Sequence, residues 1–131
     1  MYSNDGGQAS VSFTIPSCPP SVNSNYNIIF SLKRVEMKPE CRLWQSKAIT
    51  YMPTFKPIQT LPGLLRAEVT FYYPMYSKEG KLKKKDASNM LKLLIDAISN
   101  RYGIDDKFVT EGSFKAVDSE QEKTEVILSV L

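Results

Sequence analysis

The sequence contains no histidine among its 131 residues. This absence excludes mechanisms that use imidazole as a general base or nucleophile, and it excludes zinc sites that need a histidine ligand. The only two cysteines, Cys18 and Cys41, lie in unrelated contexts without CxxC spacing, and two thiolates cannot close a tetrahedral zinc site. A disulfide between them is one alternative, and reduced thiols that pack in the interior are the expectation for a cytoplasmic chain.

Long apolar runs are also missing. No stretch approaches the ~18–20 continuous apolar residues that a membrane helix needs. The first ten residues, MYSNDGGQAS, have neither a basic start nor an apolar run and so do not form a signal peptide. We expect a flexible tail over residues 1–10, one domain over residues 11–131, and a cytoplasmic location, in a bacterium or, for a phage-encoded protein, in its host.

Charge is unevenly distributed along the chain, whose net charge is +3. Six lysines and two acids occur between Lys78 and Lys92, whereas seven acids and three lysines occur between Asp105 and Glu125. This split indicates a zone that binds polyanions beside an acidic zone. The alternative is that the lysines form an ordinary solvated loop.

The N-terminal half gives a mixed secondary-structure pattern. Alternation of apolar and polar residues and turn-forming residues predict two clear strands, a ragged hairpin and a short helix capped by Ser46. The strands are Val11 to Ile15 and Leu65 to Tyr73; the hairpin pairs Tyr26 to Leu32 with Val35 to Trp44; the helix covers Lys47 to Met52.

The clearest element is a helix from Asp86 to about Tyr102. One apolar arc of this helix should face a sheet. A second, smaller strip, formed by Met90, Leu93 and Ala97, lies on the opposite side. It is explained either by burial under a loop of the same chain or by a contact with a second subunit. The sheet-facing arc contains Ala87, Leu91, Leu94, Ile95, Ile98 and Tyr102.

Gly103 ends this helix, and two strands, Phe108 to Val117 and Thr124 to Val130, follow it. The order of strands and helices predicts an α/β or α+β fold, a single compact domain in which a mixed β-sheet packs against two helices.

Asp86 precedes the long helix and is a good N-cap residue. Capping alone explains an aspartate there. However, the same carboxylate follows a run of lysines at the positive end of a helix dipole, where phosphate binds well. An acid in such a zone repels phosphate unless a cation bridges the two, which is the logic of a metal-dependent nuclease.

Asp105 and Asp106 follow Gly103, and a simple turn explains them. The alternative is a metal site, because the chain can return past the helix and Mg²⁺ needs only a few carboxylate oxygens. If a strand has already begun, the two side chains point to opposite sides and one of them remains for the site. Lys92, on the polar face, either pairs with Asp96 or stabilises a phosphoryl-transfer transition state.

These residues resemble the motif of the RusA-type Holliday junction resolvases. The matching segments are KKDASNMLK at residues 84–92, DAI at 96–98 and GIDD at 103–106, together with PPSVN at 19–23. The resemblance covers most of the chain and is most specific over residues 84–106. By position it implies that Asp86, Lys92 and Asp106 are catalytic and that Asn89 is the motif asparagine.

Ser88 departs from the pattern, because the family has an aspartate there. Serine removes one anionic metal ligand, although its hydroxyl can still ligate a metal or hold a metal-bound water. Asp96, Asp105, Glu111 or Glu68 could compensate. We therefore expect a metal site formed by Asp86 and Asp106, with Ser88 and Asp105 as further candidates.

The resemblance implies an endonuclease of DNA recombination and repair that resolves four-way junctions as a homodimer. It implies Mg²⁺ as cofactor, with Mn²⁺ as a substitute. The lysines would contact DNA phosphates, so the protein would bind DNA without reading its sequence. Asn23 and Tyr26 would either lie near the junction or only anchor a loop. A non-catalytic branched-DNA-binding protein and a purely structural domain are the rival hypotheses. The expected DNA-binding residues are Lys81, Lys83, Lys84, Lys85, Asn89 and Asn23.

Overall fold

The computed structural model describes residues 2–5, 8–20, 26–29, 34–60, 63–83, 85 and 87–131. Its main sheet has five strands in the order β1-β2-β7-β5-β6, and a separate two-stranded sheet pairs β3 with β4. The strands are β1 Tyr2–Asp5, β2 Gln8–Ile15, β3 Tyr26–Ile29, β4 Arg34–Met37, β5 Leu65–Tyr73, β6 Val109–Asp118 and β7 Lys123–Val130. The helices are α1 Pro39–Ile49, α2 Lys56–Thr60 and α3 Ala87–Tyr102, and a 3-10 turn, η2, covers Asp106–Phe108.

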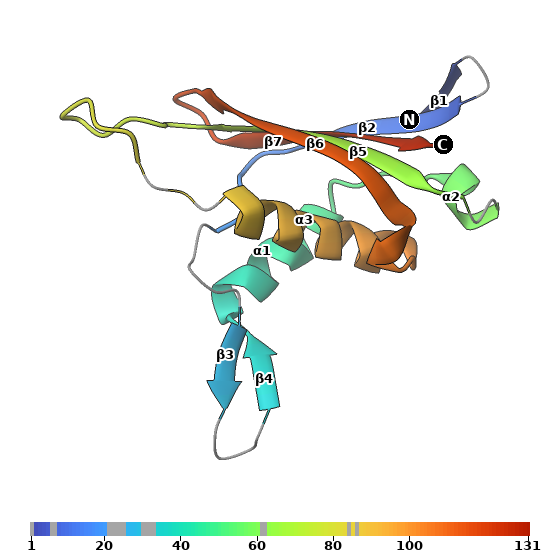
Figure 1. Cartoon of the computed structure of the whole chain (residues 1–131), viewed down its shortest axis with the longest axis horizontal. Helices are drawn as coiled ribbons and strands as arrows, with labels where there is room; N and C mark the ends of the chain where they lie inside the picture. Colours follow the sequence, from blue (N-terminus) through green and yellow to red (C-terminus); the bar gives the residue numbers. More distant parts are fainter. Residues whose placement is uncertain are drawn as a thin grey trace.

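The sheet is mixed because β5 pairs antiparallel with β7 but parallel with β6. Parallel neighbours need a crossover connection, and α3 provides it. The chain therefore runs up β5, back along α3 and up β6. Figure 1 shows α1 and α3 on one face of the sheet. This arrangement confirms the predicted α+β domain, in which a mixed sheet packs against two helices.

The hydrophobic core lies between the sheet and these two helices. Alternate residues of β2, β5 and β7 point into it, as the period of a strand requires, and they meet the apolar face of α3. Tyr102, at the end of α3, is 4% exposed and donates a hydrogen bond to the Pro53 carbonyl oxygen at 2.7 Å. Its burial raises the pKa of Tyr102 to about 12.

The second apolar strip of the long helix is buried within this chain. Met90, Leu93 and Ala97 are each 0% exposed. Helix α1 packs against α3, and Gln45 of α1 donates a hydrogen bond to the Leu93 carbonyl oxygen at 3.0 Å. The alternative of a subunit contact at this strip was therefore wrong.

The segment before α1 folds differently from the prediction. The hairpin is shorter than expected, because its second strand ends at Met37 and the chain becomes helical at Pro39 rather than remaining extended to Trp44. Proline is favoured in the first helical turn, where its missing N–H costs nothing. Ser46 therefore lies inside α1, not at its start, and its hydroxyl donates to the Arg42 carbonyl oxygen.

The N-terminal segment also differs from the expected loose tail. Tyr2–Asp5 and Gln8–Ile15 pair antiparallel, so the described part of residues 1–10 is extended and joins the sheet. The two cysteines are free thiols, and both are buried. Burial raises the pKa of the Cys18 thiol, which donates a hydrogen bond to the Tyr72 carbonyl oxygen. In the described part of the chain, no helix is long and apolar enough to cross a membrane.

Candidate metal and DNA site

The crossover from β5 through α3 to β6 positions the candidate site. Gly103 adopts a φ of +66° after the last turn of α3, a conformation that glycine enters at low cost. The Ile104 N–H bonds back to the Ser99 carbonyl oxygen at 3.1 Å. The chain thus reverses directly after the helix, and the two aspartates that follow lie between α3 and β6.

The sequence pattern allows a strand to begin at Asp105 and Asp106, but neither residue belongs to a strand. Asp106 starts the 3-10 turn η2, and Asp105 caps it by accepting a hydrogen bond from the Lys107 N–H at 3.0 Å. That hydrogen bond lowers the pKa of the Asp105 carboxyl, and a second hydrogen bond, from the Asp106 carboxyl, lowers it further. The two side chains therefore meet instead of pointing to opposite sides.

Asp106 also lines a pocket of about 250 Å³ between α3 and the start of β6. Leu91 and Ile95 of α3 form its helical wall, and residues 109–112 of β6 form the other wall. The Glu111 side chain is held by Arg66, whose Nε lies 2.8 Å from Oε2. Because Arg66 alternates with the buried Ala67, this ion pair lies on the face of the sheet away from the helices, where both residues line a second hollow with Glu68.

Glu111 and Glu68, two of the acids that could compensate for Ser88, both lie on the face of the sheet away from α3. Glu68 and Arg66 flank Ala67 on β5, and Ala67 is buried toward the helices. Because neighbouring strand residues alternate between faces, Glu68 lies on the opposite face of the sheet. There it lines a larger hollow of about 680 Å³ together with Tyr72 and Glu125. The sequence missed Arg66 as the partner of Glu111, because that pairing depends on the parallel register of β5 and β6.

The start of α3 is described only from Ala87 onward, so the expected catalytic residue Asp86 lies outside the described residues. Ser88 and Lys92 are exposed and stand one helical turn apart, and Asn89 is partly buried. At 1.5 Å of rise per residue, Leu91 lies about 6 Å along the axis from Ala87, and Ile95 lies about 12 Å from it. Asp106 therefore sits beside the second and third turns of α3.

The lysine-rich segment before α3 divides into two kinds of side chain. Lys81 and Lys83 are exposed and available to phosphates. Lys85 is partly buried, and its Nζ lies 4.6 Å from the centre of the Tyr73 ring. This cation–π contact ties Lys85 to the end of β5. Lys84 and Asn23 fall outside the described residues.

The donor set suits a hard divalent cation. Carboxylate oxygens are the ligands that Mg²⁺ and Mn²⁺ prefer, and Asp105 and Asp106 supply them next to each other in the turn after α3. Over the part of the chain that the structure describes, no group of three or more acidic or thiol side chains is close enough to hold a metal alone. Any metal site here therefore needs a ligand from elsewhere, such as Asp86, or water molecules.

A comparison with protein families agrees with this architecture. The family model described as "Endodeoxyribonuclease RusA" matches residues 17–129. Among curated proteins, none matches the chain. The matched range includes α3, the acidic turn at its end and both strands that frame the pocket.

The hydrogen bonds at Asp105 predict its titration. In a ¹³C-detected NMR titration, the Asp105 carboxyl carbon should show a midpoint below the ordinary aspartate value, and Asp106→Ala should move the midpoint up because one hydrogen bond is lost. A depressed pKa contributes stability that is present above the unfolded-state pKa and lost as the pH falls through the folded-state pKa. Lys107→Gln, which keeps the backbone N–H, should have a smaller effect. An ordinary midpoint in the unmodified protein would contradict the described contacts.

Proposed function

The chain belongs to the RusA family of endodeoxyribonucleases, and from this premise we propose that it resolves four-way DNA junctions by metal-dependent phosphodiester hydrolysis. The family resolves Holliday junctions. What supports the finer proposal is the pocket that Asp106 lines beside the helix that carries Lys92.

We assign roles to this chain's residues by combining that pocket with the motif. Asp86 and Asp106 are the proposed metal ligands, and Asp105 and Ser88 are candidates to complete the set. When bound, Mg²⁺ would lower the pKa of a coordinated water and offset charge on the scissile phosphate. Lys92 is exposed on the same helix, and we propose that its ammonium group stabilises the transition state.

The lysines before α3 would position the DNA. Lys81 and Lys83 carry exposed ammonium groups, which neutralise phosphates without reading sequence. Lys84 belongs to the same proposed set. Lys85 and Asn89 are partly buried, so we propose that they contact only DNA that lies directly against the protein surface.

We further propose that the protein acts as a homodimer. A four-way junction has approximate two-fold symmetry, and a two-fold dimer can place one site on each of two opposed strands. The dimer would also help to complete the metal site. Oxygens that share one Mg²⁺ lie about 2.0–2.1 Å from it. Leu91 and Ile95, which line the pocket with Asp106, lie about 6 and 12 Å along α3 from Ala87, the first residue of the helix. A partner subunit could therefore supply a further ligand close to Asp106.

The second candidate function is non-catalytic binding of branched DNA. The observation that favours it is Ser88, which stands where the family motif has an acid and so removes a charge from the metal site. The cleavage assay and the Ser88 variant described next distinguish the two.

The first prediction concerns cleavage. The full chain should nick a synthetic four-way junction in Mg²⁺, should not do so in EDTA, and should cut a linear duplex of the same arms far more slowly. Asp86→Asn and Asp106→Asn should each lower the cleavage rate by at least about 100-fold, because each removes a metal ligand. Junction affinity, measured in Ca²⁺, should change less than threefold.

The matched control for these variants is Glu40→Gln, which removes an exposed acid from the first turn of α1 and should cleave normally. Intact binding without cleavage of any branched substrate would overturn the enzymatic proposal. Full activity of Asp86→Asn or Asp106→Asn would remove that residue from the site.

The second prediction concerns Ser88. Ser88→Asp adds an anionic ligand one turn before Lys92, so the Mg²⁺ concentration that gives half-maximal cleavage should fall about threefold to tenfold, since ligand charge raises affinity for hard cations. Ser46→Asp, which adds a carboxylate at an exposed position of α1, serves as the matched control and should leave the Mg²⁺ requirement unchanged. A clear loss of activity in Ser88→Asp would show instead that the serine hydroxyl has a role that a carboxylate cannot fill.

A further inference from the structure

The segment between β5 and α3 forms an ordered hairpin that projects from the sheet. Tyr76 and Leu82 form an antiparallel bridge, the Lys83 N–H bonds to the Met75 carbonyl oxygen at 2.7 Å, and the Ser77 N–H bonds to the Lys81 carbonyl oxygen at 2.7 Å. Gly80 closes the turn with a φ of +79°. In Figure 1 this segment, in yellow-green tones, reaches beyond the end of the sheet. We call residues 75–83 the projecting hairpin.

The hairpin is fixed at its base rather than loosely attached. Asp118, the last residue of β6, accepts a hydrogen bond from the Met75 N–H at 2.9 Å. The Ser119 N–H bonds to the Tyr73 carbonyl oxygen at 3.0 Å, and Lys85 packs over the Tyr73 ring just beyond the hairpin. Its side chains are therefore presented in a defined direction.

The projecting hairpin exposes an apolar pair. Tyr76 is 53% exposed and Leu82 is 61% exposed. Directly opposed residues of an antiparallel pair lie on the same face, so the two side chains form one patch. Neither belongs to the core cluster of the described residues, so core packing does not account for either of them.

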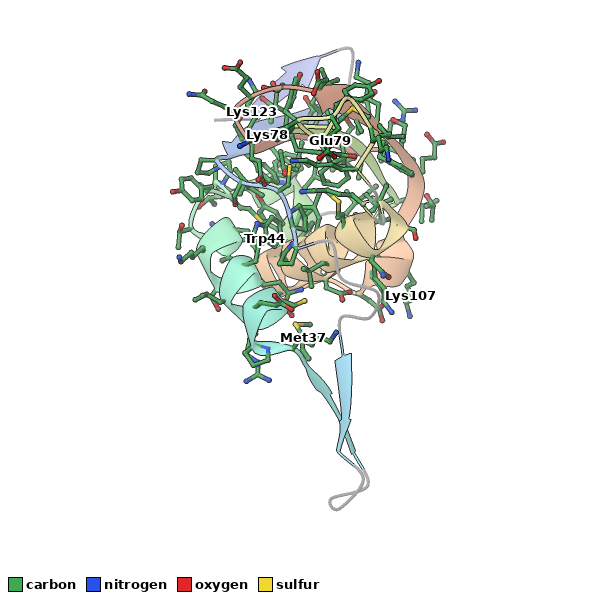
Figure 2. The ribbon with its side chains drawn as sticks, turned by 90° about the vertical axis from the view of Figure 1, so that its left-hand side faces the viewer. Met37, Trp44, Lys78, Glu79, Lys107 and Lys123 are labelled. Carbon is green, nitrogen blue, oxygen red and sulfur yellow. The ribbon has the colours of Figure 1, made fainter. Side chains whose placement is uncertain are left out.

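The charges around this patch suit nucleic acid. Lys78, Lys81 and Lys83 are exposed on the hairpin, against one acid, Glu79. Figure 2 shows Lys78 and Glu79 at the same end of the molecule as Lys123, where β7 begins. Glu120 and Glu122, in the adjacent turn, are exposed as well and oppose duplex phosphates on that side.

We infer that Tyr76 and Leu82 contact unstacked bases at a DNA branch point and so make the protein selective for branched over linear DNA. This inference rests on the proposed function. An aromatic ring accepts any base face by stacking, and bases of a continuous duplex do not offer such a face. The lysines would hold the adjoining phosphates. Because four residues span at most about 14 Å, the base of the hairpin at Lys83 lies within that distance of Ala87, at the start of the proposed catalytic helix.

The test is a binding experiment that does not depend on cleavage. The full chain, in Ca²⁺, is titrated into a four-way junction with 2-aminopurine at the branch point, and separately into a linear duplex of the same arm sequence. The unmodified protein should brighten the probe as the base unstacks. Tyr76→Ala/Leu82→Ala should abolish the brightening and weaken junction binding about tenfold, as expected for the loss of one stacked base, while duplex binding changes less than threefold. Tyr76→Phe should behave as the unmodified protein, since it keeps the ring.

The matched control is Tyr51→Ala/Leu43→Ala, which removes a second exposed tyrosine and leucine, 48% and 58% exposed, just after α1 and in the middle of it. It should leave both affinities and the probe unchanged. Each double variant should keep the thermal midpoint of the unmodified protein. The inference is overturned if the unmodified protein fails to brighten the probe, if the hairpin variant loses duplex and junction binding equally, or if sedimentation shows that the variant only changes the association of this chain with itself. If the unmodified protein brightens the probe but does not cleave the junction in Mg²⁺, the proposed function is refuted and the hairpin contact is still supported.

Discussion

The proposed chemistry depends on one electrostatic constraint: acidic side chains and DNA phosphates have to occupy the same surface. Two like charges 4 Å apart repel by about 1 kcal/mol in water and by about 4 kcal/mol near a protein surface, and several such pairs would meet at this site. A divalent cation between them turns repulsion into attraction. In this proposal the nearby lysines have a different role, because they would bind phosphates that are not being cut. The separation of Asp106 in the pocket from Lys81 and Lys83 on the projecting hairpin is consistent with this division.

The β5-α3-β6 crossover makes that division structural. Helix α3 runs back along the sheet, so its first turn receives the chain from the projecting hairpin and its last turn delivers the chain to the acidic turn η2. Helix α1 covers the inner strip of α3, which leaves the face with Ser88 and Lys92 exposed. The same connection thus carries the lysines that we propose to contact DNA, the proposed catalytic lysine and the acids on one continuous stretch of chain.

Much of this could be predicted because it is local in sequence. The 3.6-residue periodicity of α3, the stop at Gly103 and the strand patterns of residues 65–73, 108–117 and 124–130 all predicted elements that the structure confirms. Only the end of helix α1 was predicted, in the helix over Lys47 to Met52. Its start was missed because the sequence up to Trp44 was assigned to a strand, although Pro39 suits a first helical turn. The meeting of Asp105 with Asp106 was missed because a 3-10 turn, not a strand, follows Gly103. Tyr76 and Leu82 could not be paired from sequence, because only the hairpin's hydrogen bonds set them opposite each other. Asp86 remains a prediction, since it lies outside the described residues.

The most direct test of the account is whether the acids bind a divalent cation. Calorimetric titration of Mn²⁺ into the full chain at neutral pH and low ionic strength should give saturable binding that Asp106→Asn weakens at least tenfold, about 1.4 kcal/mol, and that Glu120→Gln leaves unchanged. No saturable binding, or equal binding by Asp106→Asn and the unmodified protein, would contradict the claim that these carboxylates share a metal with the DNA.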